Sequence, residues 1–188
     1  MGAGLAGCAN VRSMDASRGS GETPAPDDVD RSAGSTPPAA VPGPFGTYDP
    51  ELAAFLLGQR GLEAGITGYL GIRIVDVGPG WATAELDVRD ELLHGFGAAH
   101  GGVVATLVDQ VLGSAVFPLV PAGTWPATLE FKVNYLAAVR AGVARATGRV
   151  VSLRRRTAVV RVEVANDGTP VAEALGTVAL NPPPSGGG

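Results

Sequence analysis

The 188-residue chain contains one long apolar helix among segments that are typical of β-strands. The helix is predicted from His100 to Phe117, because Pro118 lacks an amide hydrogen and cannot continue it. Strands are predicted at 69–77, 81–88, 128–136, 142–153, 157–165 and 171–180. A single helix must therefore cover a sheet of about six strands, and an antiparallel sheet that curls around the helix lets the two bury each other. The predicted fold class is α+β.

Shorter signals mark the other elements. Asp49 is a good N-cap and Pro50 suits a first helical position, so a short helix is expected from Asp49 to Gly61. Gly78-Pro79-Gly80 is expected to join the first two strands, and Asn166-Asp167-Gly168 the last two. In the second strand, Ala82, Ala84, Leu86 and Val88 alternate with Thr83, Glu85 and Asp87, which predicts one buried and one solvent-facing side.

The long helix has two stripes of different character. Its expected sheet-facing side consists of Val103, Val104, Leu107, Val108, Val111, Leu112, Ala115 and Val116. The neighbouring stripe is small or polar and consists of Ala105, Thr106, Asp109, Gln110, Gly113 and Ser114. Ala105 and Gly113 lie one turn to either side of Asp109 and leave room for another molecule or subunit. Asp109 is thus a candidate functional acid, and the alternative is that it simply faces water.

Both histidines fall in the segment that leads into this helix, His94 to Gly102. A glycine-rich turn at a helix N-terminus presents unpaired backbone N–H groups, which can stabilise a developing negative charge. The structural alternatives are that His100 only caps the helix and that Gly101 and Gly102 serve backbone geometry. A metal site formed by His94, His100 and Asp109 is not expected, because the spacing matches no common ligand pattern.

Composition limits the partners and the compartment. The net charge of −4 argues against binding to nucleic acid or to an anionic membrane. Cys8 is the only cysteine, so an intrachain disulfide is impossible and a reducing, cytoplasmic location is expected. Leu5-Ala6-Gly7-Cys8 matches a lipoprotein motif by chance, because seven residues are too few for a signal sequence. No stretch is expected to reach the roughly 18 apolar residues that span a bilayer.

The ends of the chain differ in composition from its centre. Residues 1–46 are rich in proline, glycine and serine without an apolar period, so a disordered N-terminal tail is expected. Residues 182–188, with prolines and three glycines, are expected to form a disordered C-terminal tail. One domain is therefore predicted over residues 47–181.

The run His100-Gly101-Gly102 followed by Asp109 resembles the His-Gly-Gly…Asp signature of the PaaI-type (phenylacetate-pathway) acyl-CoA thioesterases. The resemblance covers approximately residues 48–181 and implies the hotdog fold, a single antiparallel sheet wrapped around one long central helix. It implies that the Gly101 N–H polarises a thioester carbonyl, and that Asp109 of the partner subunit acts as general base on water or as nucleophile. Thr128 occupies the position where relatives often place a water-orienting Ser or Thr.

The resemblance also implies an assembly and a substrate. A homodimer, paired into a dimer of dimers, is expected because the site needs groups from two chains. Acyl-CoA is the expected substrate, with no separate cofactor, no metal, no nucleic acid and no membrane partner. The substrate-binding candidates are Gly102, Thr106, Gln110, Gly113, Arg154, Arg155 and Arg156. The three arginines are interpreted as a phosphate clamp, with a solvated turn as the alternative.

One position departs from the family pattern, and two other interpretations stay open. His94 stands where relatives carry Asn, and a neutral imidazole can replace the amide as donor or acceptor. The alternative function is a non-catalytic hotdog module that binds acyl-CoA, which would be expected to lack the acid. A hotdog dehydratase is weaker because Glu130 and Glu173 lie on strands instead of the helix. The acyl group is not identified; Phe96, Phe117 and Trp125 are candidate pocket residues for an aromatic or an aliphatic group.

Overall fold

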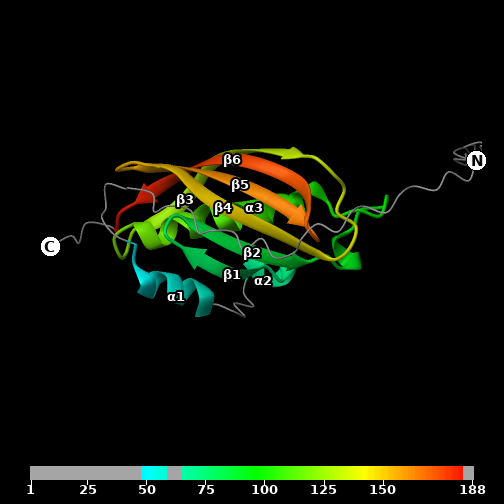
Figure 1. Cartoon of the computed structure of the whole chain (residues 1–188), viewed down its shortest axis with the longest axis horizontal. Coiled ribbons are helices and arrows are strands. Elements are labelled where there is room, and N and C mark those ends of the chain that lie inside the picture. The colour runs from blue at the N-terminus through cyan, green and yellow to red at the C-terminus, as the bar shows by residue number, and fades with distance from the viewer. Residues whose placement is uncertain (1–47, 59–64, 184–188) are drawn as a thin grey trace, which may run out of the picture. The chain divides into compact units, whose positions relative to one another are not determined.

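The computed structural model describes residues 48–58 and 65–183, and the chain forms a six-stranded antiparallel sheet with one long helix (Figure 1). The helices are α1 (Pro50–Gly58), α2 (Gly65–Leu70) and α3 (Gly101–Val116). The strands are β1 (Arg73–Gly78), β2 (Trp81–Asp87), β3 (Trp125–Tyr135), β4 (Val143–Leu153), β5 (Thr157–Asn166) and β6 (Thr169–Asn181). Short 3-10 helices span Asp90–Leu92 and Phe117–Leu119.

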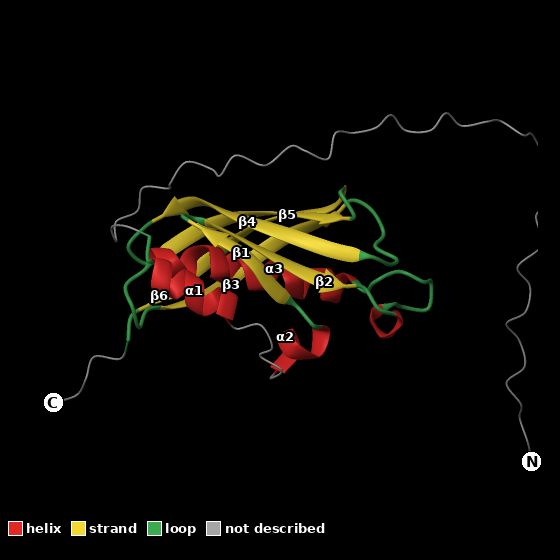
Figure 2. Cartoon of the chain, turned by 60° about the horizontal axis from the view of Figure 1, so that its bottom comes forward, coloured by secondary structure: helices red, strands yellow, loops and turns green. Residues whose placement is uncertain are grey.

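The strand order is β1-β2-β4-β5-β6-β3, so β1 and β3 form the two edges of the sheet. Helix α3 contacts all six strands and lies across one face of the sheet (Figure 2). Helix α1 contacts β1 and the Phe117–Leu119 turn that follows α3. This arrangement confirms the predicted hotdog fold.

The core lies between α3 and the sheet. Leu107, Val108, Val111 and Leu112 are completely buried there. The helix approaches the sheet so closely that a Cβ at Gly148 of β4 would lie 2.9 Å from the Val111 carbonyl oxygen. Val103, at the margin of the predicted sheet-facing stripe, is half-buried and packs against this core, and Ser114 of the small and polar stripe is buried. Ser114 is accommodated there because its hydroxyl donates to the Gln110 carbonyl at 2.7 Å.

Helices α1 and α3 begin at residues whose side chains cap them. The Asp49 carboxylate accepts hydrogen bonds from the backbone N–H groups of Glu51 (2.8 Å) and Leu52 (3.2 Å). His100 precedes α3 in extended conformation, and its Nδ1 accepts from the Gly102 N–H at 3.2 Å. His100 is therefore the N-cap of α3. Helix α1 ends at Gly58, and the rest of the predicted 49–61 helix lies outside the described residues, as do residues 1–46 and 184–188.

The expected strand from Tyr69 to Val77 is wrong in its first part. Residues Gly65–Leu70 form α2, which ends at Gly71 with a positive φ of 75°. The Gly71 N–H donates to the Gly68 carbonyl and the Ile72 N–H to the Thr67 carbonyl, both at 3.0 Å, which is a Schellman helix end. Strand β1 begins only at Arg73. The apolar residues next to Gly71 were mistaken for the start of the strand.

The remaining strands are confirmed with shifted ends. Strand β3 begins at Trp125 instead of residue 128 and tolerates Pro126 because it lies at a sheet edge. The turn between β5 and β6 is confirmed: Asp167 and Gly168 have φ of 46° and 85°, the conformation of a type I′ turn. Thr83 was expected to face solvent but is buried, and its hydroxyl lies 3.1 Å from that of Thr147 on β4.

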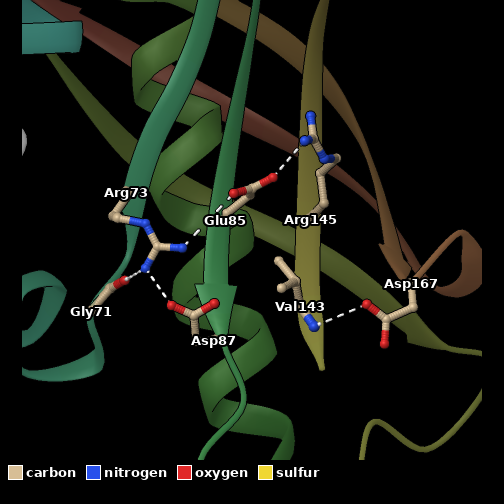
Figure 3. A network of polar contacts seen from close by, with 7 residues as sticks. All are labelled: Gly71, Arg73, Glu85, Asp87, Val143, Arg145 and Asp167. Atoms are coloured by element: carbon tan, nitrogen blue, oxygen red, sulfur yellow. Dashed lines mark hydrogen bonds and ion pairs between the residues drawn. The ribbon is translucent and has the colours of Figure 1, made fainter. Parts of the chain in front are cut away.

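A polar network joins β1, β2 and β4 (Figure 3). Arg73 lies 2.6 Å from Asp87 and 3.8 Å from Glu85, and Arg145 lies 2.5 Å from the other oxygen of Glu85. The hydrogen bond from Arg73 holds the pKa of the Asp87 carboxyl below its usual value. Arg73, Asp87 and Arg145 are exposed and only Glu85 is partly buried, so solvent screening keeps the contribution of these ion pairs to stability small.

The expectation that no segment reaches membrane-spanning character needs correction. Within 48–58 and 65–183, the helical segment Gly101–Leu119 is long and apolar enough to cross a membrane by length and composition, with a mean hydropathy of 1.5. Its apolar side chains are those that fill the core of the domain, and 56% of the segment is buried. Its hydropathy is thus accounted for by packing against the sheet.

The His100 cap gives a test of stability. Replacing His100 with Ala removes the acceptor for the Gly102 N–H and should lower the free energy of unfolding by about 0.5–2 kcal/mol. His100→Asn, a strong N-cap, should recover most of this loss in chemical denaturation. Equal stability of His100→Ala and wild type would contradict the cap.

Candidate active site

A short loop before α3 places His94. Leu93 and Ala99 form a β-bridge, and the His94 N–H donates to the Ala98 carbonyl at 2.8 Å. Gly97 has a positive φ of 73°, which lets its N–H turn back onto the His94 carbonyl at 2.8 Å. The Arg140 guanidinium stabilises the loop by donating hydrogen bonds to the carbonyls of Phe96 (3.3 Å) and Gly97 (3.0 Å). The loop is therefore a defined hairpin that leads directly into the helix.

The cap on α3 determines which backbone N–H remains available. The Gly102 N–H donates to the His100 side chain, and the Val103 N–H donates to the His100 carbonyl at 2.8 Å. Among the described residues, the Gly101 N–H has no hydrogen-bond partner. Gly101 thus contributes an unoccupied donor at the positive end of the helix dipole.

His94 lines the same pocket as Gly101. This pocket has a volume of about 420 Å³, and its other walls include Tyr135 and the segment 136–139. The Nδ1 atom of His94 accepts from the Phe96 N–H at 3.1 Å. In the neutral ring the proton is therefore on Nε2, which makes His94 a second hydrogen-bond donor. The imidazole can thus take the donor role of an Asn amide.

Tyr135 is a site residue that the sequence did not reveal. It lies at the end of β3, lines the Gly101 pocket, and donates its hydroxyl to the Gly101 carbonyl at 2.8 Å. A single tyrosine at the end of a strand carries no signal in the sequence, because the contact spans 34 positions along the chain.

Asp109 lies in a second region, two helical turns further along α3. Its side chain is exposed and lines two pockets of about 510 Å³ and 560 Å³. Thr128 of β3 lines both pockets as well, so Asp109 and Thr128 of one chain face the same two pockets. A β-bulge between Thr128 and Glu130 leaves Leu129 exposed beside them.

The other helix candidates divide between these pockets. Thr106 lines the smaller Asp109 pocket, and its hydroxyl donates to the Gly102 carbonyl at 2.9 Å. Gln110 and Gly113 line the larger one. The Gln110 side chain is held by Thr67 and Ser114, each at 3.3 Å. A Cβ at Gly113 would meet no atom within 4 Å, so this wall of the pocket is open.

One chain does not bring the donors and the acid together. Gly101 and Asp109 are separated by about 12 Å along the helix axis. The pocket that contains Gly101 does not include Asp109, and neither Asp109 pocket includes Gly101 or His94. Each chain therefore carries two separate halves of a candidate site.

The arginine run lies away from all three pockets. Arg154, Arg155 and Arg156 are exposed in the turn between β4 and β5. Backbone hydrogen bonds hold this turn: the Arg154 N–H donates to the Thr157 carbonyl and the Leu180 N–H to the Arg156 carbonyl. None of the three arginines lines the Gly101 pocket or an Asp109 pocket. In the part of the chain that the structure describes, no three His, Cys, Asp or Glu side chains are grouped to hold a metal ion.

Known proteins resemble the chain over this region. The family model of the thioesterase superfamily matches residues 96–173. A 1,4-dihydroxy-2-naphthoyl-CoA hydrolase from Listeria monocytogenes is 27% identical over 103 residues, which cover 55% of this chain and 84% of the relative.

Solved structures share the fold. A mutant thioesterase from Pseudomonas aeruginosa is 27% identical with a TM-score of 0.63, and the match covers 69% of this chain and 94% of that one. A variant of the phenylacetic acid degradation protein PaaI from Thermus thermophilus is 33% identical with a TM-score of 0.56, and the match covers 60% of this chain and 96% of that one. The chain therefore belongs to the thioesterase superfamily, as a hotdog-fold member of the PaaI type.

Proposed function

We propose that the protein is an acyl-CoA thioesterase whose active site is completed by two copies of the chain. The observation that carries the proposal is the separation of the two half-sites: donors at Gly101 and His94 in one pocket, Asp109 and Thr128 in others. Neither half can polarise a carbonyl and activate water by itself. A second subunit that brings its Asp109 to the first subunit's Gly101 supplies both functions at one place.

The edge strand β3 offers a way to make this arrangement. Tyr135, at one end of β3, lines the donor pocket, and Thr128, towards the other end, lines the same pockets as Asp109. Antiparallel pairing of β3 with its own copy would place the Tyr135 end beside the Thr128 end of the partner. Leu129 is 62% exposed on this edge, as expected of a surface that a second chain covers. We propose a homodimer on this basis, and a dimer of dimers as the full assembly.

The chemistry follows from the two halves. The thioester carbonyl oxygen accepts hydrogen bonds from the Gly101 N–H and the His94 Nε2–H, which stabilise the negative charge of the tetrahedral intermediate. The Asp109 carboxylate of the partner subunit takes a proton from water oriented by Thr128, or attacks the carbonyl carbon itself. In the first route the oxygen of that water adds to the carbonyl carbon, the C–S bond breaks, and the CoA thiolate takes up the proton held by Asp109, which leaves the free acid. In the second route cleavage of the C–S bond leaves a mixed anhydride on Asp109, and a water molecule hydrolyses it, which releases the free acid, regenerates the carboxylate and supplies the proton for the CoA thiolate.

The larger Asp109 pocket is the proposed place of the acyl group. Phe55, Phe117 and Trp125 line it, and the Phe55 and Phe117 rings lie 6.2 Å apart. Such walls suit an apolar or aromatic acyl group. Phe96, the third candidate from the sequence, lines none of the three pockets and is 91% exposed. The naphthoyl-CoA substrate named for the Listeria relative is a suitable first test among acyl-CoA esters.

The proposed reaction needs no separate cofactor, because CoA enters as part of the substrate. We propose no nucleic acid or membrane partner, in keeping with the net charge of −4. The single cysteine is compatible with a reducing compartment, and we propose a cytoplasmic location.

Removal of the acid tests the proposal most simply. Asp109→Asn keeps the shape of the side chain but cannot accept a proton, so kcat should fall by about 10²–10⁴-fold. The thermal unfolding temperature should stay near wild type or rise slightly, because a functional carboxylate is removed. Asp76→Asn, on the opposite edge strand, is the matched control and should leave the release of CoA thiol unchanged. Full turnover by Asp109→Asn would refute the mechanism, and a wild type that binds acyl-CoA without hydrolysis would favour the non-catalytic module.

The arginine turn is proposed to bind the CoA phosphates in the assembled protein. Replacing Arg154, Arg155 and Arg156 with Gln should then raise KM for acyl-CoA with little change in kcat, because remote contacts bind ground state and transition state alike. Activity on a short CoA-free thioester should be unaffected. Arg161→Gln, on the exposed side of β5, controls for the loss of charge. An equal loss on both substrates would show that the turn supports folding instead.

A further inference from the structure

Tyr135 connects the edge strand β3 to the first residue of α3. Its hydroxyl donates to the Gly101 carbonyl at 2.8 Å. Tyr135 is 51% exposed, so this hydrogen bond does not result from burial of the ring in the core. We propose that Tyr135 is a positioning residue that fixes the orientation of the Gly101 N–H donor. The inference rests on the proposed thioesterase function and adds a residue that acts through the backbone without contacting the reacting atoms.

The contact closes a chain of hydrogen bonds. The Gly101 carbonyl and the Gly102 N–H belong to the same peptide group. Its oxygen accepts from Tyr135, and its N–H donates to His100 Nδ1 at 3.2 Å. Hydrogen bonds at both ends of a peptide group polarise it and strengthen each other. The plane of this peptide is therefore held from two sides, and the preceding N–H, that of Gly101, is held with it.

The ring of Tyr135 makes a second, steric contact with the same residue. A Cβ at Gly101 would lie 3.1 Å from both Cζ and the hydroxyl oxygen of Tyr135. Alanine at this position would require the ring to shift by a few tenths of an ångström, which strains the hydrogen bond. Gly101 is thus needed partly to make room for Tyr135, and the two residues form one unit.

The first experiment removes the hydroxyl and keeps the ring. In Tyr135→Phe, kcat should fall by about 2- to 10-fold with KM nearly unchanged, as expected for one hydrogen bond lost from a donor that acts in the transition state. The amide proton resonance of Gly102 should move upfield in the ligand-free protein, because its hydrogen bond to His100 weakens. Tyr69→Phe is the matched control: Tyr69 is 67% exposed, and its hydroxyl has no hydrogen bond among the described residues.

The second experiment tests whether the two residues act together. If Gly101→Ala already strains the Tyr135 hydrogen bond, adding Tyr135→Phe should lower kcat by less than it does in the wild type, so the two losses should not multiply. Losses that multiply, as for independent residues, would overturn the inference. So would a Tyr135→Phe variant with wild-type kcat and an unmoved Gly102 resonance.

Both of these outcomes leave the wild type active, so they affect only the role of Tyr135. A wild type that is inactive on all acyl-CoA esters would instead overturn the proposed function and, with it, the role of Tyr135.

Discussion

The burial of one side of α3 against the sheet is the constraint on which the rest of the structure depends. Leu107, Val108, Val111 and Leu112 are completely buried, and Gly148 lets the helix backbone approach β4. Because this side is fixed, Asp109 on the neighbouring stripe is exposed and faces a pocket that β3 also lines. The same packing carries the start of the helix to the His94 loop. The position of each functional group thus follows from how one helix is packed.

The distance between Gly101 and Asp109 along α3 explains why one chain carries the two halves of the proposed site at separate places. A donor at the first residue and an acid two turns later lie about 12 Å apart, too far for one thioester carbonyl and its attacking water. The strand at the sheet edge reaches both places, since Tyr135 lines the donor pocket and Thr128 lines the pocket that contains Asp109. An edge strand that pairs with its own copy therefore relates the two halves by symmetry.

Features that depend on neighbouring residues, such as helix caps, turns and the helical repeat of α3, could be predicted from the sequence. Features that depend on contacts between distant parts of the chain could not. The Asp49 and Asp167-Gly168 signals and the period of α3 depend on neighbouring residues, and the structure confirms them. The sequence does not predict α2, because its six residues, Gly65–Leu70, are too few to show a helical repeat of apolar residues. The strand-forming residues that follow then dominate the prediction for this segment. The burial of Thr83 and the Tyr135 contact depend on partners 64 and 34 positions away, which no local pattern encodes.

Complementation between two inactive variants tests the central claim, that the donor and the acid come from different chains. Asp109→Asn and Gly101→Val each damage one half-site and should be inactive alone. After the two are unfolded together and refolded at equal amounts, half of the dimers should be mixed, and each mixed dimer keeps one intact site. The mixture should then recover about a quarter of wild-type activity. Activity no higher than that of the separate variants, with mixed dimers present, would contradict a shared site.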